Sequence, residues 1–229
     1  MGTRLIFDNQ EIKKIDVVEK QWDLDADYTI CMTDALDSEY KYNLTNAGFR
    51  FHDRVLNFEI SLVGIGDDLN GENKLNGIDF IVDSEISQAV VDLACQAYKT
   101  DRRFHLDPIY NQEKANRVIA AYIEYLRNKI GIKVYEAFYK DELLGFTVVD
   151  EMADENRVFF ENLLGATKPG IKGKMIAVPL YRRMLQSEAD KFKKYRGWVS
   201  ASNMASINLH IQLGGHISDI SDEFIYVKK

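Results

Sequence analysis

Hydrophobic and polar positions divide the chain into two patterned stretches that flank residues 64–77. In the first stretch, residues 28–32 and 54–62 have the apolar character of strands, and residues 37–49 between them follow a helical pattern. We expect this helix to end at Gly48, because glycine adopts the left-handed conformation that closes many helices. The first stretch therefore predicts a small α/β unit.

The second stretch predicts the element order β-α-α-β-β-β-α-β-α-β. Apolar residues recur at helical spacing after the first strand, for example at Ile86, Val90 and Leu93. We expect strands at residues 78–82, 134–139, 143–152, 157–166, 198–202 and 224–228, and helices at residues 84–99, 112–128, 176–195 and 203–215. Three of these strands follow one another without a helix between them, so an antiparallel meander is predicted.

Residues 64–77 read GIGDDLNGENKLNG and lack any apolar periodicity. Runs of Gly, Asp and Asn are typical of loops and linkers. We therefore predict two domains, a small N-terminal α/β domain at residues 1–70 and a larger domain at residues 78–229. The fold class is α/β in an α+β arrangement.

Acidic residues outnumber basic residues by 36 to 29, which gives a net charge of −7. A protein that binds a phosphate backbone needs a basic face, so no nucleic-acid partner is expected. Cys31 and Cys95 have no neighbouring Cys or His cluster, so neither a metal site nor a disulfide framework is predicted. No apolar run is long enough to span a bilayer, and a reduced, cytoplasmic protein without a membrane partner is expected.

The segment GATKPGIKGKMIAV, residues 165–178, lies between a predicted strand and a predicted helix. Glycines there let backbone N–H groups at a helix start approach a bound anion. Positive charge comes from Lys168, Lys172 and Lys174. Pro179 fits a helix that begins no earlier than about residue 176, since a first-turn N–H has no intrahelical partner to lose. The segment is either an anion-binding turn or a basic surface turn.

Residues 169–177, PGIKGKMIA, resemble the acyl-CoA loop of the GNAT N-acetyltransferases, whose usual form is P-x-[YF]-R-G-x-G-[IL]-[GA]. Gly173 matches the central glycine, whereas Lys172 replaces the arginine and Met175 replaces the next glycine. The resemblance implies a GNAT fold, with a mixed, mostly antiparallel central sheet flanked by helices, and acetyl-CoA as cosubstrate without a metal. It assigns cofactor contacts to Ala166, Thr167, Lys172, Gly173, Lys174, Met175, Ile176 and Ala177.

Residues 203–215, NMASINLHIQLGG, are similar to a second GNAT signature, N-x-x-A-x-x-L-Y-x-x-x-G-F. At about 100° per residue, Asn203, Ser206 and His210 share a stripe about 60° wide on this helix. The resemblance implies that Asn203 and Ser206 contact the cofactor. It also implies that His210, at the position of the family's tyrosine, protonates the departing thiolate. The alternative is a core histidine that bonds a backbone carbonyl.

Acylation of an amine requires its uncharged form, so a carboxylate that accepts its proton is expected. GNAT enzymes often place this carboxylate on the strand that enters the acyl-CoA loop, and Glu161 lies on that strand. The resemblance therefore implies that Glu161 is the base, with Glu136 as the second candidate. A solvent-facing strand residue without a catalytic role remains the alternative for Glu161.

Two further segments resemble the WecD-like GNAT enzymes, which acetylate nucleotide-linked amino sugars such as dTDP-fucosamine. Residues 100–108, TDRRFHLDP, are similar to their SRF-x-x-D segment, and residues 47–62 are similar to a G-F-x-x-x-D-x-x-L-x-F-E strand region. Arg103 and Phe104 are accordingly expected to contact the substrate. An arginine at this place pairs with a diphosphate or a carboxylate, or it braces its own loop through Asp107.

The sequence thus predicts an N-acetyltransferase that moves an acetyl group from acetyl-CoA to a small-molecule amine by direct attack on the thioester. A nucleotide-linked amino sugar is the favoured acceptor, and an amino acid, a polyamine or an antibiotic is the first alternative. The second alternative is a degenerate GNAT module that binds CoA or a partner without turnover, suggested by Met175 and by the absent tyrosine. A homodimer is left open.

Overall fold

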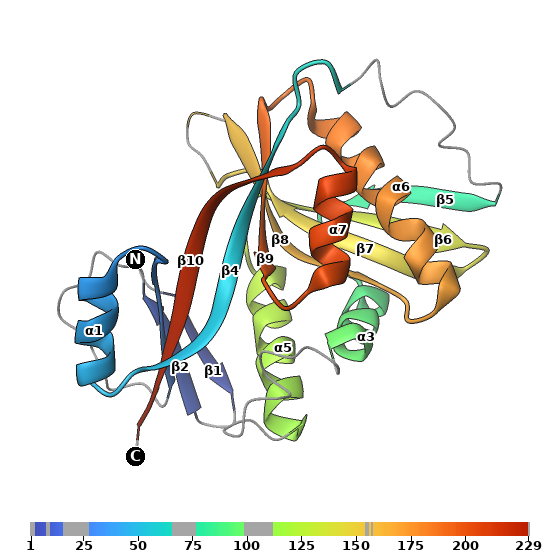
Figure 1. The fold of residues 1–229 in the computed structure, drawn as a ribbon. Helices are drawn as coiled ribbons and strands as arrows, with labels where there is room; N and C mark the ends of the chain where they lie inside the picture. Colours follow the sequence, from blue (N-terminus) through green and yellow to red (C-terminus); the bar gives the residue numbers. More distant parts are fainter. Residues whose placement is uncertain are drawn as a thin grey trace.

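The computed structural model describes residues 3–7, 10–15, 28–65, 77–98, 112–153, 156 and 158–228, and Figure 1 shows how they are arranged. The helices are α1 (Ser38–Asn46), α3 (Gln88–Ala97), α5 (Gln112–Arg127), α6 (Ile171–Glu188) and α7 (Met204–Gln212). The strands are β1 (Thr3–Phe7), β2 (Gln10–Ile15), β3 (Tyr28–Asp34), β4 (Arg50–Ser61), β5 (Ile78–Asp83), β6 (Ile132–Tyr139), β7 (Glu142–Asp150), β8 (Phe159–Thr167), β9 (Lys194–Ser200) and β10 (His216–Val227). The predicted substrate contacts Arg103 and Phe104 lie outside the described residues.

Ten described strands form one sheet in the order β1-β2-β3-β10-β4-β9-β8-β7-β6-β5. The β2–β3 and β8–β9 pairs are parallel and the other pairs are antiparallel, so the predicted mixed, mostly antiparallel sheet is confirmed. Strands on both sides of residues 64–77 belong to this sheet, because β4 pairs with β9 and β10. The division into two domains stays a prediction.

Helices cover both faces of the sheet. Successive strand residues point to opposite faces, and on β6 Val134 joins the core under α3 and α5 while Tyr135 joins the core under α6. Helix α7 packs beside α6, since Leu209 and Leu213 contact the α6 core. Among the described helices, none combines the length and apolar composition needed to cross a bilayer.

Helix α6 begins earlier than the sequence predicts. Gly170 precedes it with a φ of 108°, a conformation that glycine adopts without strain, and the helix starts at Ile171. Pro179 therefore lies inside the helix and not in its first turn, so that prediction was wrong. The missing N–H of Pro179 leaves the carbonyl of Met175 without its intrahelical donor. Met175 is largely exposed, so water can replace that donor.

Two β-α-β units of equal dimensions supply four adjacent strands of the sheet. The first unit is β3, α1 and β4, and the second is β9, α7 and β10. Each element of the second unit begins and ends 166 residues after its counterpart (194 − 28 at the start, 227 − 61 at the end). The identical residues at corresponding positions are few: Ala35/Ala201, Gly48/Gly214, Asp53/Asp219 and Phe58/Phe224. The repeat is therefore evident in the backbone and not in the sequence.

The two units are related by a pseudo-twofold axis, and the long strand of each unit pairs with the short strand of the other. β3 pairs with β10, and β9 pairs with β4. The registers correspond, since Tyr28 lies opposite Val227 just as Lys194 lies opposite Ser61. Each short strand is thus completed by the long strand of the other unit, and Figure 1 shows β4 and β10 running side by side between α1 and α7.

The centre of the repeat is the antiparallel pair of β4 and β10. Val55 lies opposite Ser221, its own counterpart in the repeat, so this residue pair marks the pseudo-twofold axis. The register shifts in this strand pair leave out His52 and Ser218, which also correspond to each other. The two register shifts are therefore related by the same pseudo-twofold axis.

The helices of the repeat have matching ends. The side chains of Asp37 and Asn203 each accept a hydrogen bond from the N–H three residues later, as helix N-caps do. Gly48 and Gly214 follow the helices with φ values of 90° and 81°. The predicted role of Gly48 at the end of the first helix is confirmed.

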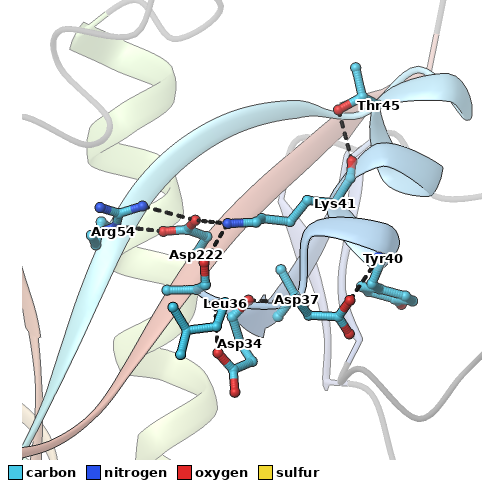
Figure 2. A network of polar contacts seen from close by, with 10 residues as sticks. Asp34, Leu36, Asp37, Tyr40, Lys41, Thr45, Arg54 and Asp222 are labelled. Carbon is cyan, nitrogen blue, oxygen red and sulfur yellow. Dashed lines mark hydrogen bonds and ion pairs between the residues drawn. The ribbon is translucent and has the colours of Figure 1, made fainter.

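A buried carboxylate ties α1 to the centre of the sheet. Asp222 of β10 accepts hydrogen bonds from Arg54 Nε of β4 at 2.7 Å and from Lys41 Nζ of α1 at 2.9 Å, as Figure 2 shows. Burial acts to raise the pKa of Asp222, but the hydrogen bonds and charges of Arg54 and Lys41 outweigh it and lower the pKa below 3.8. The carboxylate thus joins both halves of the repeat.

We expect Asp222→Asn to destabilise the protein by about 1–3 kcal/mol at pH 7 and by less at pH 3. A carboxyl whose pKa is lowered by folding contributes stability above its unfolded-state pKa, and the contribution is lost as the pH falls through the folded-state pKa. Urea unfolding at the two pH values measures both differences. Asp219→Asn, at an exposed position of β10, is the control and should change stability by less than about 0.5 kcal/mol. Equal losses at both pH values for Asp222→Asn would contradict this expectation.

Candidate functional site

Strands β8 and β9 separate part of the way along their length. Their parallel pairing runs from Phe159 opposite Lys194 to Asn162 opposite Gly197, although both strands continue beyond it. On its other side, β8 remains paired with β7 but skips Leu163. Such a bulge bends a strand, so the end of β8 follows β7 and leaves β9.

The separated end of β8 directs backbone groups away from β7. Lys168 N donates to Leu144 O of β7 at 2.7 Å, and orientation alternates along an antiparallel strand. Gly165 and Thr167 therefore turn their N–H and C=O groups toward the side that β9 has left. Ala166 and Thr167, the predicted cofactor contacts on this strand, are half-buried there.

The carbonyl groups on this side have partners from the helices of the α3 and α5 face. Tyr98 Oη donates to Gly165 O at 3.0 Å, and Tyr122 Oη donates to Leu163 O at 3.2 Å. These two hydrogen bonds hold the separated end of β8 in place. The arrangement leaves a fixed row of strand backbone along the gap.

Three residues separate the end of β8 from the start of α6, and α6 has no side-chain cap at Gly170. In contrast, side chains cap α1, α3 and α7 through Asp37, Ser87 and Asn203. A Cβ atom at Gly170 would meet nothing within 4 Å, so the space beside the helix start is open. Uncapped first-turn N–H groups and the helix dipole favour a bound anion.

The predicted cofactor contacts of the glycine-rich segment occupy the first two turns of α6. Lys172, Gly173 and Lys174 lie in the first turn, and the side chains of the two lysines are outside the described part of the structure. Met175 is 62% exposed, Ile176 is buried in the core under α6, and Ala177 is half-buried.

His210 lies in the protein interior, with 2% of its surface exposed. Its Nδ1 is 2.8 Å from Ser206 O, and its Nε2 is 2.9 Å from Tyr195 Oη. A carbonyl only accepts, so Nδ1 carries the proton of the neutral ring and Nε2 accepts from the Tyr195 hydroxyl. Burial lowers the pKa of His210 below 6.5, against the smaller opposing effect of the Ser206 hydrogen bond.

A glycine makes room for the contact between Tyr195 and His210. A Cβ atom at Gly197 would lie 2.6 Å from Tyr195 Oη and 2.7 Å from His210 Nε2. The imidazole also packs near the rings of Phe58 and Tyr181. A glycine on β9 is thus required for a hydrogen bond that joins β9 to α7.

The predicted polar stripe on α7 has only one member in the interior. Asn203 is exposed, and its Oδ1 accepts from Ser206 N at 3.1 Å as the helix cap. Ser206 is half-buried and receives the His210 hydrogen bond through its carbonyl. The structure therefore places the cap and the imidazole at different depths.

The two predicted catalytic residues lie on opposite faces of the sheet. Tyr195, the partner of His210, faces α6, whereas Arg196 beside it faces the other way. Glu161 is in register with Arg196 and accepts a hydrogen bond from Trp198 Nε1. The second candidate base, Glu136, is buried away from the gap, and Ser87 Oγ donates to it at 3.1 Å.

Sequence reasoning missed several polar residues around the gap. Asn162 Nδ2 donates to Thr147 Oγ1, and the pKa of Tyr181 is raised by burial despite hydrogen bonds to both side chains. Tyr195 and Trp198 were missed as well. The predicted strand began at residue 198, and a start at residue 194 would have placed Tyr195 and Trp198 on alternate faces.

Comparisons with known proteins give a fold. No protein-family model matches the chain, and no curated protein matches it. A functionally unknown conserved protein from Staphylococcus epidermidis matches 96% of this chain and 85% of its own, with a TM-score of 0.58 and 11% identity. A tandem GNAT protein from the clavulanic acid biosynthesis pathway matches 87% of this chain and 64% of its own, with a TM-score of 0.56 and 13% identity.

A GCN5-related N-acetyltransferase from Kribbella flavida matches 88% of this chain and 69% of its own, with a TM-score of 0.54 and 11% identity. At these identities the similarity concerns the fold alone. The chain has the GNAT acetyltransferase fold, and no subfamily is assigned.

We expect the imidazole of His210 to be neutral at pH 7, with its proton on Nδ1, and to titrate below pH 6.5. Burial disfavours the charged ring, and the Ser206 carbonyl selects the tautomer. Long-range ¹H–¹⁵N NMR spectra of the histidine rings report both properties, and His210→Phe assigns the signals. A proton on Nε2, or a midpoint above pH 6.5, would show that this hydrogen-bond arrangement is wrong.

Proposed function

We propose that this protein is an acetyl-CoA-dependent N-acetyltransferase acting on a small-molecule amine. The observation that carries the proposal is the separation of β8 from β9 beyond Asn162, which leaves strand backbone facing a gap. The uncapped start of α6 follows this strand directly. The fold comparisons support the same class of reaction.

The residues around the gap fit a CoA thioester. The N–H groups of Gly165 and Thr167 point toward the gap, where they can hold the amide-rich arm and the thioester carbonyl. The open space beside Gly170, together with the α6 dipole, suits a pyrophosphate. Lys172 and Lys174 in the first turn add positive charge.

The bound thioester supplies an activated acetyl group and a thiolate leaving group. Glu161 takes the proton of the acceptor ammonium, directly or through water, so that the nitrogen lone pair attacks the carbonyl carbon. The C–N bond forms as the C–S bond breaks. The charged form of His210 gives a proton to the sulfur, and the acylated nitrogen releases its second proton to water, which leaves the neutral amide. Because the two residues lie on opposite faces, proton removal and proton donation occur on opposite sides of the gap.

His210 meets one condition in this role. Its Nδ1 is engaged by Ser206, so the donated proton has to leave from Nε2, which accepts from Tyr195 in the neutral ring. Because the ring is neutral at pH 7, His210 donates only after Nε2 has taken up a second proton, and this protonation also reverses the Tyr195 hydrogen bond. Asn203 and Ser206, at the start of the same helix, are the proposed contacts to the arm of the cosubstrate.

The proposed acceptor is a small amine, with a nucleotide-linked amino sugar as the specific candidate. That candidate depends on Arg103 and Phe104, which the sequence places between α3 and α5. An amino acid, a polyamine or an antibiotic requires the same chemistry at Glu161 and is tested in parallel.

We expect free CoA at 100 times its Kd to raise the free energy of unfolding by about 2.7 kcal/mol. Lys172→Glu should weaken this binding at least tenfold, on the order of 1.4 kcal/mol, because it places a negative charge beside the pyrophosphate. Thermal unfolding with and without CoA measures both effects. Lys193→Glu, at an exposed position remote from the start of α6, is the matched control and should bind like the wild type. An unshifted melting temperature of the wild type would refute cofactor binding.

We expect His210→Phe to lower kcat by about 100-fold while CoA affinity changes less than about twofold. Phenylalanine preserves the ring packing but removes both hydrogen bonds of His210. Release of free thiol from acetyl-CoA is measured against a panel of amino sugars, amino acids and polyamines. Unchanged turnover would make His210 a core residue. If no amine releases thiol although CoA binds, the protein is a binding module without turnover.

A further inference from the structure

We propose that Trp198 is a positioning residue for Glu161 and that its exposed ring face receives the cationic acceptor. The inference rests on the proposed function and narrows its acceptor to an amine that arrives as an ammonium ion. Nothing in the GNAT sequence signatures points to this tryptophan. It follows from the side chains at the point where β8 and β9 separate.

Trp198 lies where β8 and β9 begin to separate. It is the first residue of β9 after Gly197, the last one paired with β8. It shares a sheet face with Arg196, two residues earlier, and therefore with Glu161, which is in register with Arg196. The indole N–H donates across the strands to Glu161 Oε1. A single hydrogen bond thus bridges β8 and β9 where their backbone pairing has ended.

The neighbouring charges are already matched with one another. Arg196 Nε bonds Glu59 Oε1 at 2.8 Å, and Lys194 Nζ bonds Glu59 Oε2 at 2.8 Å. From β7, Asp150 lies opposite Glu161 in register and pairs with Lys129 at 3.0 Å.

The charge of Lys129 also acts on Glu161. The indole N–H adds a directed hydrogen bond to the Glu161 carboxylate. A hydrogen bond to the charged form favours the carboxylate over the acid, and a base has to be ionised to accept a proton.

Trp198 is 45% exposed, although it sits in the middle of a strand whose alternate residues are buried. An indole face attracts cations, and an ammonium ion there lies beside the acid that takes its proton. The proton passes from this ammonium to Glu161, and the neutral nitrogen is then available for acylation. An aromatic face and a carboxylate on one side of the gap select for a cationic amine.

Comparison of the two units of the repeat shows which side chains the backbone fold requires and which it does not. The counterpart of Trp198 in the first unit is Met32, and the counterpart of His210 is Leu44. In the parallel pair β2–β3, Lys14 occupies the register position that Glu161 has in β8–β9. The same backbone thus forms without the tryptophan, the carboxylate or the histidine, so packing alone does not demand them.

The test compares two substitutions that separate the N–H from the ring. Trp198→Phe keeps an aromatic face but removes the donor, so the acidic limb of the pH profile of kcat/KM should move to higher pH by about half to one unit. Trp198→Leu removes both and should additionally raise the KM for a cationic amine by about fivefold. Trp22→Phe is the control for loss of a tryptophan and should leave the profile unchanged.

A second readout uses the protein without acetyl-CoA. In the Trp22→Phe variant, Trp198 is the remaining tryptophan, and its fluorescence should change between pH 3 and pH 7 as Glu161 ionises. Glu161→Gln should abolish this step.

The outcomes separate the two proposals. If the wild type turns over and the acidic limb of the pH profile of kcat/KM does not move in Trp198→Phe, the positioning role is overturned. A pH-dependent fluorescence change that persists in Glu161→Gln would overturn it as well. An unchanged KM in Trp198→Leu would overturn the cation platform. No turnover in the wild type with any amine would instead refute the proposed function, while the fluorescence titration still decides whether the indole and the carboxylate are bonded.

Discussion

The pairing of β4 with β10 is the interaction on which the rest of the structure depends. It joins residues far apart in the sequence, for example Val55 and Ser221, so the sheet is complete only after these two distant segments have met. Both strands have twelve residues, and each also completes a short strand of the other unit. Without this pairing the sheet would divide between β10 and β4, and each of these two strands would expose an unpaired edge.

The same constraint opens the candidate site. β4 pairs with β9 along the full range from Lys194 to Ser200, whereas β8 pairs with β9 only as far as Gly197. β9 is therefore held by β4, and β8 is held by β7 beyond the bulge at Leu163. Each strand therefore keeps a backbone partner on its other side where the two strands diverge. Tyr195 and Gly197 then place His210 behind one face of this gap, and Trp198 fixes Glu161 on the other.

The sequence revealed the elements whose signals are local. The meander of β6, β7 and β8 follows from apolar runs joined by short connections, and the end of α1 follows from Gly48. It did not reveal β1 and β2, nor the repeat, whose corresponding residues rarely coincide. Helix geometry correctly placed His210 on one side of α7, but only the tertiary structure could show that Tyr195 and Gly197 surround it. The choice of partner across strands is a non-local event that periodicity does not encode.

The difference between the halves of the repeat bears on what His210 is for. Leu44 fills the corresponding place in the first unit with Cys31 and Phe224 around it and forms no side-chain hydrogen bond there. A buried imidazole costs free energy unless both nitrogens are bonded. The second unit meets this need with a carbonyl, a tyrosine hydroxyl and a glycine that leaves room for them. A leucine would satisfy the fold with none of these, so packing alone does not explain the polar set, whereas the role proposed for His210 would.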